Sequence, residues 1–276
     1  MSESKYIFIT GAASGIGRAT ANRFASQGWR VGAADLDEAG LASLGSELGG
    51  DAYSAYPLDV TNAEMFDAVI AEFADWSGGR LDVLYNNAGI GISGYFEDIP
   101  LERSLDIVNV NLVGVIHGIY AALPLLKRTP NSLCFSTSSS AATYGAASLA
   151  VYAATKFAVK GLTEALAVEL SRHDVRVADV LPGLIDTPIL NCDRYVDGKV
   201  TSQEGERSIG ANIPDEGMFR LIQPSEVAEA VWNAYHEDKL HWYVPAEIEE
   251  IDLEKVKSPE AMRDGRIEML KLMLDA

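Results

Sequence analysis

The chain has 276 residues, 48% of them hydrophobic and 22% charged. These values exclude a disordered or collagen-like protein. The length suits one large α/β domain, and by itself it also allows two small ones. Forty acidic residues against 22 lysines and arginines give a formal net charge of -18, and such a surface repels phosphate backbones and anionic lipids, so neither nucleic acid nor a membrane is an expected partner.

Short apolar runs alternate with longer amphipathic stretches along the chain. Strands are predicted at residues 6–9, 30–34, 52–56, 81–85, 132–137, 176–181 and 241–244. Helices are predicted at residues 15–26, 41–48, 63–75, 101–127, 150–172, 223–236 and 266–274. Strands that alternate with helices of this length indicate βαβ units, and therefore a doubly wound parallel sheet with helices on both faces, in a single domain.

The alternation stops after Pro182. Scattered Gly, Pro, Asp and Ser follow, with weak periodicity, and a loop this long in a compact domain is usually a lid or binding segment. We expect residues 188–222 to form a substrate lid and residues 246–276 to form a C-terminal extension.

The N-terminus, the cysteines and the histidines exclude several other classes of protein. Residues 1–5 lack the charged-then-apolar layout of a signal peptide, and no apolar run approaches the roughly 20 residues that cross a bilayer, so a cytoplasmic location is expected. Cys134 and Cys192 do not suggest a disulfide framework. The four histidines lack metal-ligand spacing, so no metal site is expected.

A glycine-rich turn directly follows the first predicted strand and opens the first helix, with glycines at Gly11, Gly15 and Gly17. Glycine permits a tight turn and removes the Cβ that would block a pyrophosphate, while free amides at the helix start attract an anion. The spacing G-xxx-G-x-G differs from the general dinucleotide fingerprint, and a plain strand–helix turn is the alternative. Its place after the first strand favours phosphate binding.

Asp35 lies at the end of the second predicted strand. A carboxylate there accepts hydrogen bonds from the adenosine ribose hydroxyls and repels a 2′-phosphate. Neither Ala13 nor Leu36 supplies a cation to offset that repulsion. The pattern favours NAD over NADP, and a solvated loop aspartate is the alternative.

Tyr152 and Lys156 lie four residues apart on the predicted helix at 150–172. This spacing places both side chains on one helix face, where an ammonium favours tyrosinate and lowers the pKa of the phenol. Transfer of a hydride from carbon requires such an acid/base partner for the oxygen. By itself, however, the pair is common on helix surfaces.

A run of hydroxyl side chains, Ser136–Ser140, ends the fifth predicted strand. It falls at the carboxyl edge where doubly wound sheets bind ligands, so a hydroxyl there can hold a carbonyl oxygen beside Tyr152. A polar strand-end turn is the alternative.

Together these motifs resemble the short-chain dehydrogenase/reductase family, in its single-domain branch. They occur in the family's order and cover about residues 5–190. The matching residues are Thr10–Gly17, Asp59–Val60, Asn86–Gly89, Asn111, Ser136–Ser140, Tyr152–Lys156 and Pro182–Thr187. The resemblance implies a Rossmann-type sheet of about seven strands.

The resemblance also implies a role for each catalytic residue. Tyr152 would be the acid/base, and Lys156 would bind the nicotinamide ribose and tune Tyr152. Ser139 would orient the substrate oxygen, with Ser138 or Ser140 as the alternative if the register is shifted. Asn111 would hold the water that links Lys156 to solvent.

A larger set of residues would bind the cofactor. By the same resemblance, Asp59 and Val60 would flank the adenine, and Ile185 and Thr187 would contact the nicotinamide carboxamide. The full set is Gly11, Ser14, Gly15, Ile16, Gly17, Asp35, Leu36, Asp59, Val60, Asn87, Ala88, Gly89, Tyr152, Lys156, Pro182, Gly183, Ile185 and Thr187.

The function expected is that of an NAD-dependent oxidoreductase, interconverting a secondary alcohol and a ketone. The apolar lid favours a hydrophobic or aromatic substrate, and sugars and acyl-linked ketones are the alternatives. A regulatory sensor that binds NAD without turnover is one alternative, but sensors tend to lose Tyr152 or Ser139. A non-redox lyase of the same fold is another, but that class uses Arg where Lys156 stands. Candidates for lining an apolar substrate pocket, or for ordinary packing, are Tyr144, Tyr195, Met218 and Phe219.

In family members, two long helices form a subunit interface, so the resemblance implies a homodimer or homotetramer. The corresponding helices are those predicted at 101–127 and 150–172. Their apolar positions include Leu105, Val108, Leu112, Val159 and Leu166. The alternative is that these side chains pack on the sheet.

Overall fold

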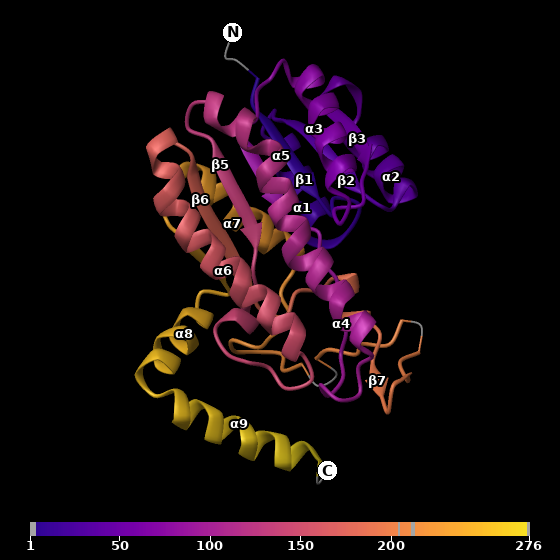
Figure 1. Ribbon diagram of the computed structural model, residues 1–276, viewed down its shortest axis with the longest axis vertical. Helices are drawn as coiled ribbons and strands as arrows, with labels where there is room; N and C mark the ends of the chain where they lie inside the picture. The colour runs from indigo at the N-terminus through magenta and orange to yellow at the C-terminus, as the bar shows by residue number, and fades with distance from the viewer. Residues whose placement is uncertain (1–3, 204, 211–212, 275–276) are drawn as a thin grey trace.

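A parallel sheet of seven strands forms the centre of the structure, a computed structural model that describes residues 4–203, 205–210 and 213–274 (Figure 1). Its strands are β1 (Tyr6–Thr10), β2 (Arg30–Asp35), β3 (Tyr53–Pro57), β4 (Val83–Asn86), β5 (Leu133–Thr137), β6 (Arg176–Pro182) and β9 (His241–Val244). Their order is β3-β2-β1-β4-β5-β6-β9, and every pair is parallel. The predicted doubly wound, Rossmann-type single domain is confirmed.

Helices cover both faces of this sheet, as predicted. One face carries α1 (Gly15–Ala25), α2 (Glu38–Leu48) and α7 (Pro224–His236). The other carries α3 (Ala63–Ser77), α5 (Gly114–Arg128) and α6 (Ala150–Leu170).

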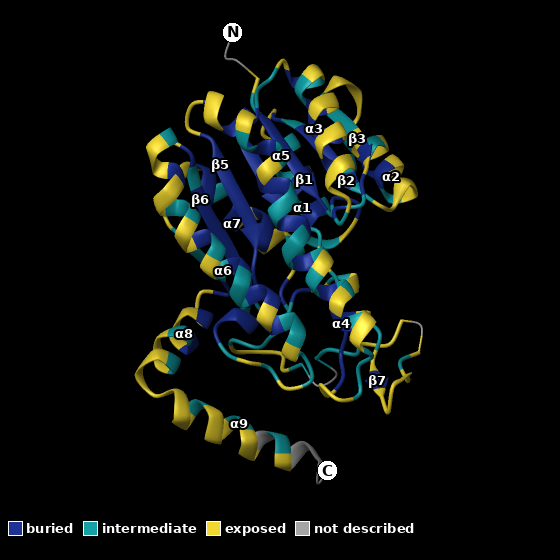
Figure 2. Cartoon of the chain, viewed as in Figure 1, coloured by how far each residue is buried: buried dark blue, intermediate teal, exposed yellow. Residues whose placement is uncertain are grey.

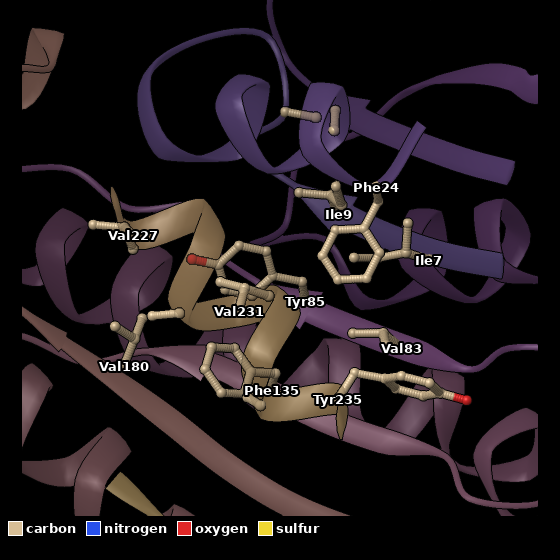
Figure 3. Packing of buried hydrophobic residues seen from close by; sticks show 14 of the residues in the cluster. Ile7, Ile9, Phe24, Val83, Tyr85, Phe135, Val180, Val227, Val231 and Tyr235 are labelled. Atoms are coloured by element: carbon tan, nitrogen blue, oxygen red, sulfur yellow. The ribbon is translucent and has the colours of Figure 1, made fainter. Parts of the chain in front are cut away.

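The two faces bury two separate hydrophobic clusters. Ile7 and Ile9 of β1 join the first cluster with Phe24 and Val231 (Figure 3). Phe8, between them in the sequence, joins the second cluster on the opposite face. Since successive side chains of a strand point to opposite faces, a strand covered on both sides is apolar at every position.

The predicted helix at 101–127 contains an irregularity that its periodicity does not reveal. It comprises α4 (Leu101–Val108), a π-helical segment (Asn109–Val113) and α5. π segments are rare and often occur at functional sites, and this one holds Asn111, whose side chain is fully buried.

By length and composition alone, the stretch Leu101–Arg128 is apolar enough to cross a membrane, which differs from the expectation of no such run. The same criterion is met by core helices. Here Val115, Ile119 and Leu126 are buried in the second cluster, so one side of this stretch packs on the sheet.

Two helices occupy the C-terminal extension, whereas the sequence predicts one, at 266–274. They are α8 (Ile248–Lys257) and α9 (Pro259–Leu274). The break falls at Ser258 because Pro259 follows it. A proline is tolerated in the first turn of a helix but not in its interior. α9 extends away from the sheet, and most of its described surface is exposed (Figure 2).

The segment 188–222 begins with a 3-10 helix (Pro188–Asn191) and continues into a small antiparallel hairpin, β7 (Tyr195–Val196) and β8 (Lys199–Val200). Ser93 pairs with the hairpin's neighbour Arg194, which ties the segment to the loop after β4. Its role as a substrate lid stays a prediction.

The sheet order creates a crevice at one defined place. From β1 the chain builds outward to β2 and β3, whereas β4 pairs with the other side of β1. The loops that leave β1 and β4 therefore diverge, and doubly wound sheets bind ligands at this switch point.

Candidate active site

A cavity of about 540 Å³ lies at the carboxyl ends of the strands. It is lined by the loops that follow β1, β2, β3, β4, β5 and β6, together with α6. Of the predicted site residues, those in its wall are Gly11, Ser14, Gly15, Ile16, Asp35, Leu36, Asp59, Val60, Asn87, Ala88, Gly89, Ser139, Tyr152, Lys156, Pro182, Gly183, Ile185 and Thr187. Gly17 and Asn111 lie behind this wall.

The glycine turn is packed too closely for any side chain. A Cβ on Gly17 would lie 2.1 Å from the carbonyl oxygen of Gly11. Gly11 and Gly15 have φ angles of 66° and 50°, and a Cβ on Gly11 would approach the Ala88 backbone at 2.8 Å. Ser14, the N-cap of α1, makes no side-chain capping bond, so the first amides of α1 have no such partner and suit an anion.

Asn87 fastens the loop after β4 to the glycine turn. Its Nδ2 donates to the carbonyl oxygens of Thr10 and Gly11 at 3.1 and 3.2 Å, and its Oδ1 accepts from the Thr137 hydroxyl at 3.1 Å. One amide side chain thereby joins the ends of β1, β4 and β5, which fixes the floor of the cavity.

Asp35 is held in place at the cavity edge by two backbone amides. Its Oδ2 accepts from Ala13 N at 2.9 Å and its Oδ1 from Asp37 N at 3.0 Å. Arg18, a nearby cation, pairs with Glu47 and donates to the carbonyls of Ala13 and Gly40. The carboxylate of Asp35 is thus fixed in the cavity wall, which also holds Asp59.

Tyr152 and Ser139 meet at the opposite end of the cavity, where they share a side-chain hydrogen bond. Burial raises the pKa of Tyr152, and this hydrogen bond opposes the rise. The Ser138 hydroxyl instead donates to the Lys156 carbonyl at 2.9 Å, so the hydrogen bonds favour Ser139 over its neighbour.

Lys156 is 3% exposed and lies one helical turn from Tyr152. Its Nζ donates to the Thr137 carbonyl at 2.8 Å and lies 5.6 Å from the centre of the Tyr152 ring. Burial lowers the pKa of Lys156 to about 8. The sequence analysis predicts that the ammonium of Lys156 lowers the pKa of Tyr152. This prediction is wrong: burial outweighs any attraction to the ammonium, and the pKa of the phenol rises.

This geometry agrees with the comparisons with known proteins. The sequence model described as short chain dehydrogenase matches residues 5–194. The chain belongs to the short-chain dehydrogenase family. The resemblance seen in the sequence is therefore confirmed.

Two curated relatives of this short-chain dehydrogenase are each 34% identical to it. One is the "Probable oxidoreductase EphD" of Mycobacterium tuberculosis, over 238 residues that make up 84% of this chain and 40% of that protein. The chain thus spans less than half of EphD's length. The other is the 3-oxoacyl-(acyl-carrier-protein) reductase FabG of Thermotoga maritima, over 231 residues, 83% of this chain and 89% of that one.

Solved structures share the fold over nearly the whole chain. A short chain dehydrogenase/reductase of Burkholderia phymatum, in complex with NAD, is 26% identical, with a TM-score of 0.78, over 93% of this chain and 96% of that one. An alcohol dehydrogenase of Thermococcus sibiricus, complexed with 5-hydroxy-NADP, is 28% identical, with a TM-score of 0.72, over 87% and 95%.

Asn111 supports the site of this short-chain dehydrogenase from behind. Its Oδ1 accepts from Ile90 N at 2.8 Å, and its Nδ2 donates to the Ile90 carbonyl at 3.0 Å. A Cβ on Gly89 would lie 3.3 Å from Asn111 Oδ1 and 3.7 Å from Lys156 Nζ, so both side chains meet the same glycine. That Asn111 holds a water stays a prediction.

Several apolar residues of the cavity wall are absent from the sequence prediction. They are Leu58, Ile90, Val110, Leu149, Ile189, Leu190 and Ile209, along with the half-buried Cys192. Burial raises the pKa of the Cys192 thiol to about 11. Ile189, Leu190, Cys192 and Ile209 fall within the lid predicted at 188–222, but the sequence does not single them out. An apolar residue carries no signal that separates a pocket wall from ordinary packing, so sequence alone gives no means of finding the other four.

Of the four residues predicted to line an apolar substrate pocket, the structure places one in the cavity wall. Tyr144 lines the cavity. Phe219 contacts Tyr144 from outside it, with ring centroids 6.3 Å apart. Tyr195 is buried in a small cluster with Ile92 and Ile107 instead, and Met218 is not in the cavity wall. Among the described residues, no group of three or more His, Cys, Asp or Glu is placed to hold a metal ion.

Proposed function

We propose that this short-chain dehydrogenase interconverts a secondary alcohol and a ketone, using NAD as its hydride carrier. The observation that carries the proposal is the meeting of Tyr152, Ser139 and Lys156 in the wall of one cavity. A nicotinamide dinucleotide supplies or accepts the hydride when it is bound. The glycine turn, which any Cβ would fill, fits the phosphates of such a cofactor.

The chain's own residues move the proton. Because burial raises its pKa, Tyr152 is a phenol at neutral pH and can donate its proton to a carbonyl oxygen during reduction. Ser139, hydrogen-bonded to Tyr152, orients that oxygen. In the reverse direction Tyr152 must first lose its proton, and the hydrogen bond from Ser139 favours that charged form.

NAD is the proposed cofactor in preference to NADP. Asp35 lies in the cavity wall with its carboxylate fixed by Ala13 and Asp37 amides, and a carboxylate at a strand end repels a 2′-phosphate. The nearby Arg18 is paired with Glu47. Dissociation constants for NADH and NADPH, measured by fluorescence, test this: similar affinities would overturn the preference.

The proposed substrate is hydrophobic or aromatic. Around Tyr152, the cavity wall is built from Tyr144, Leu149 and Leu184, together with Ile189 and Leu190 at the start of the 188–222 segment. Lys156 is the one basic side chain in the described wall, and it is engaged with Thr137. Such a wall favours an uncharged, apolar ketone.

The experiment mixes the protein with NADH and then with a panel of apolar and aromatic ketones. NADH binding raises cofactor fluorescence, and turnover lowers absorbance. Tyr152→Phe should bind NADH normally and lose about 10²- to 10⁴-fold in kcat, because it lacks the proton donor. Binding without turnover of any ketone or alcohol would favour a sensor, and undiminished rates in Tyr152→Phe would refute the proton route.

We also propose that the protein associates with a second copy of itself. Large apolar side chains are exposed on α4, α5 and α6, namely Leu101, Leu105, Tyr120 and Val168. By contrast Val159, one of the predicted interface positions, is 1% exposed and packs in the second cluster.

A further inference from the structure

Tyr144 forms part of the cavity wall on the loop that carries Ser139 toward α6. The loop runs from the 3-10 turn Ser140–Ala142 to the start of α6 at Ala150. The Tyr144 ring is half-buried and meets the Phe219 ring edge-on, at an interplanar angle of 88°. Phe219 belongs to the 188–222 segment, so the two rings join the serine loop to that segment.

Arg266 of α9 completes this contact from outside the domain core. Its guanidinium carbon lies 3.9 Å from the centre of the Tyr144 ring and 5.8 Å from that of Phe219. At these distances a guanidinium is attracted to the face of an aromatic ring. Within the described parts of the chain, Arg266 has no ion pair or hydrogen bond, so the two rings are its principal contacts.

A second cavity, of about 570 Å³, borders two of these three side chains, Phe219 and Arg266. Phe219 lines it, together with residues of α8 and α9 that include Met262, Gly265 and Arg266. Tyr144 lines the first cavity and contacts two residues that line the second. Tyr144, Phe219 and Arg266 together therefore lie between the two spaces.

An ion pair also joins the 188–222 segment to the C-terminal extension. Arg220 Nη1 lies 3.0 Å from Glu247 Oε1, which ties the residue after Phe219 to the start of the C-terminal extension. This ion pair holds the start of α8, the helix that precedes α9, against the 188–222 segment.

We propose that Arg266 is a positioning residue for substrate selection: by stacking on Tyr144 and Phe219, it holds the Tyr144 ring as the outer wall of the substrate cavity. This wall limits how long a ketone the cavity accepts. The limit on substrate length rests on the proposed ketone chemistry, whereas the placement of Tyr144 by Arg266 does not.

The first test needs no substrate. Hydrogen exchange of the amides at residues 143–149 is measured in the wild type, in Arg266→Ala and in Arg263→Ala. Arg263 is the matched control, because it lies on the same helix, is 64% exposed and pairs with the adjacent Asp264. Loss of the stack should speed exchange by about threefold in Arg266→Ala and leave Arg263→Ala unchanged.

The second test measures selection along a series of methyl ketones, from butanone to decanone, with NADH. Tyr144→Ala removes the ring from the outer wall of the first cavity, so kcat/KM for the longest ketones should rise about tenfold relative to butanone. Arg266→Ala should shift the profile in the same direction by about threefold. Arg266→Lys keeps the charge but lacks the planar guanidinium, and should restore part of the wild-type profile.

The outcomes separate this inference from the proposed function. If the wild type reduces no ketone, the proposed function fails, and the exchange experiment alone decides whether Arg266 holds Tyr144. If ketones are reduced and Arg266→Ala shows wild-type exchange and a wild-type length profile, the inference is overturned. Faster exchange together with a shifted profile and an unchanged dissociation constant for NADH supports it.

Discussion

Lys156 carries its charge in a nearly fully buried position, and this costs stability. Burial lowers the pKa of its ammonium from 10.5 to about 8, a shift worth about 3 kcal/mol. Lys156→Met removes that cost but leaves the Thr137 carbonyl without its donor, a loss of about 1 kcal/mol. We expect the variant to unfold with a free energy about 2 kcal/mol higher than wild type at neutral pH, and to lose activity.

The difference in unfolding free energy between Lys156→Met and wild type depends on pH. Because the folded-state pKa of Lys156 lies below the unfolded value, the unfolded chain binds one more proton between these pKa values. Wild-type stability therefore rises from pH 8 to 10.5, and the advantage of Lys156→Met narrows. Urea unfolding at both ends of this window measures it, with Lys160→Met as control, since Lys160 is paired with Asp252. A less stable Lys156→Met at neutral pH would contradict the argument.

Ser139 is expected to control the pH profile of Tyr152. Burial raises the pKa of the phenol and the hydrogen bond with Ser139 opposes that rise, so alcohol oxidation, which needs tyrosinate, should increase with pH above neutrality. Ser139→Ala removes the opposing bond. Its oxidation rate should fall by about 10²-fold, and its pH profile should move to higher pH. A slower variant with an unmoved profile would mean that Ser139 acts on substrate alone.

At the level of elements, the turn between β1 and α1 depends on the absence of a side chain. Gly17→Ala places a Cβ 2.1 Å from the Gly11 carbonyl oxygen, which is backbone and has little room to move. We expect a loss of about 3 kcal/mol in unfolding free energy and much weaker NADH binding. Gly161→Ala in α6 is the control, because nothing lies within 4 Å of its Cβ; it should stabilise by about 1 kcal/mol. Equal melting temperatures for the two variants would count against the packing argument.

The sequence predicts well those helices and strands whose buried residues recur in a regular pattern along the chain. Apolar runs such as Tyr6–Ile9 give the strands, because a parallel sheet buries both faces. The order of glycines, asparagines and hydroxyl residues along the chain places the cofactor and catalytic residues at strand ends, and the cavity brings nearly all of them together.

Features that depend on tertiary contacts leave no such pattern. The π segment Asn109–Val113 keeps the apolar periodicity of the helices around it. Helix α8 ends at Lys257 for a local reason, the proline two residues later. The contact of α9 with Tyr144, by contrast, arises only in the folded chain. The rise in the Tyr152 pKa likewise follows from burial, which the four-residue spacing to Lys156 does not report.

For the whole molecule, net charge and exposed apolar surface oppose each other. A charge of -18 on each chain repels a second copy, whereas Leu105, Tyr120 and Val168 on α4, α5 and α6 lose water contact if two copies meet. Salt screens the repulsion and leaves the apolar attraction in place.

Association should therefore strengthen as salt increases. We expect light scattering behind size-exclusion chromatography to give a larger mass at about 0.3 M NaCl than at about 10 mM, since the screening length shortens severalfold over this range. Tyr120→Asp adds a charge where an apolar ring is 77% exposed and should shift the protein toward monomer at both salt concentrations. Leu253→Asp, on α8 and 56% exposed, adds the same charge outside α4, α5 and α6 and should behave as wild type. A wild-type protein that stays monomeric at every concentration and salt would show that this apolar face has another use, and an equal effect of both substitutions would assign the change to charge alone.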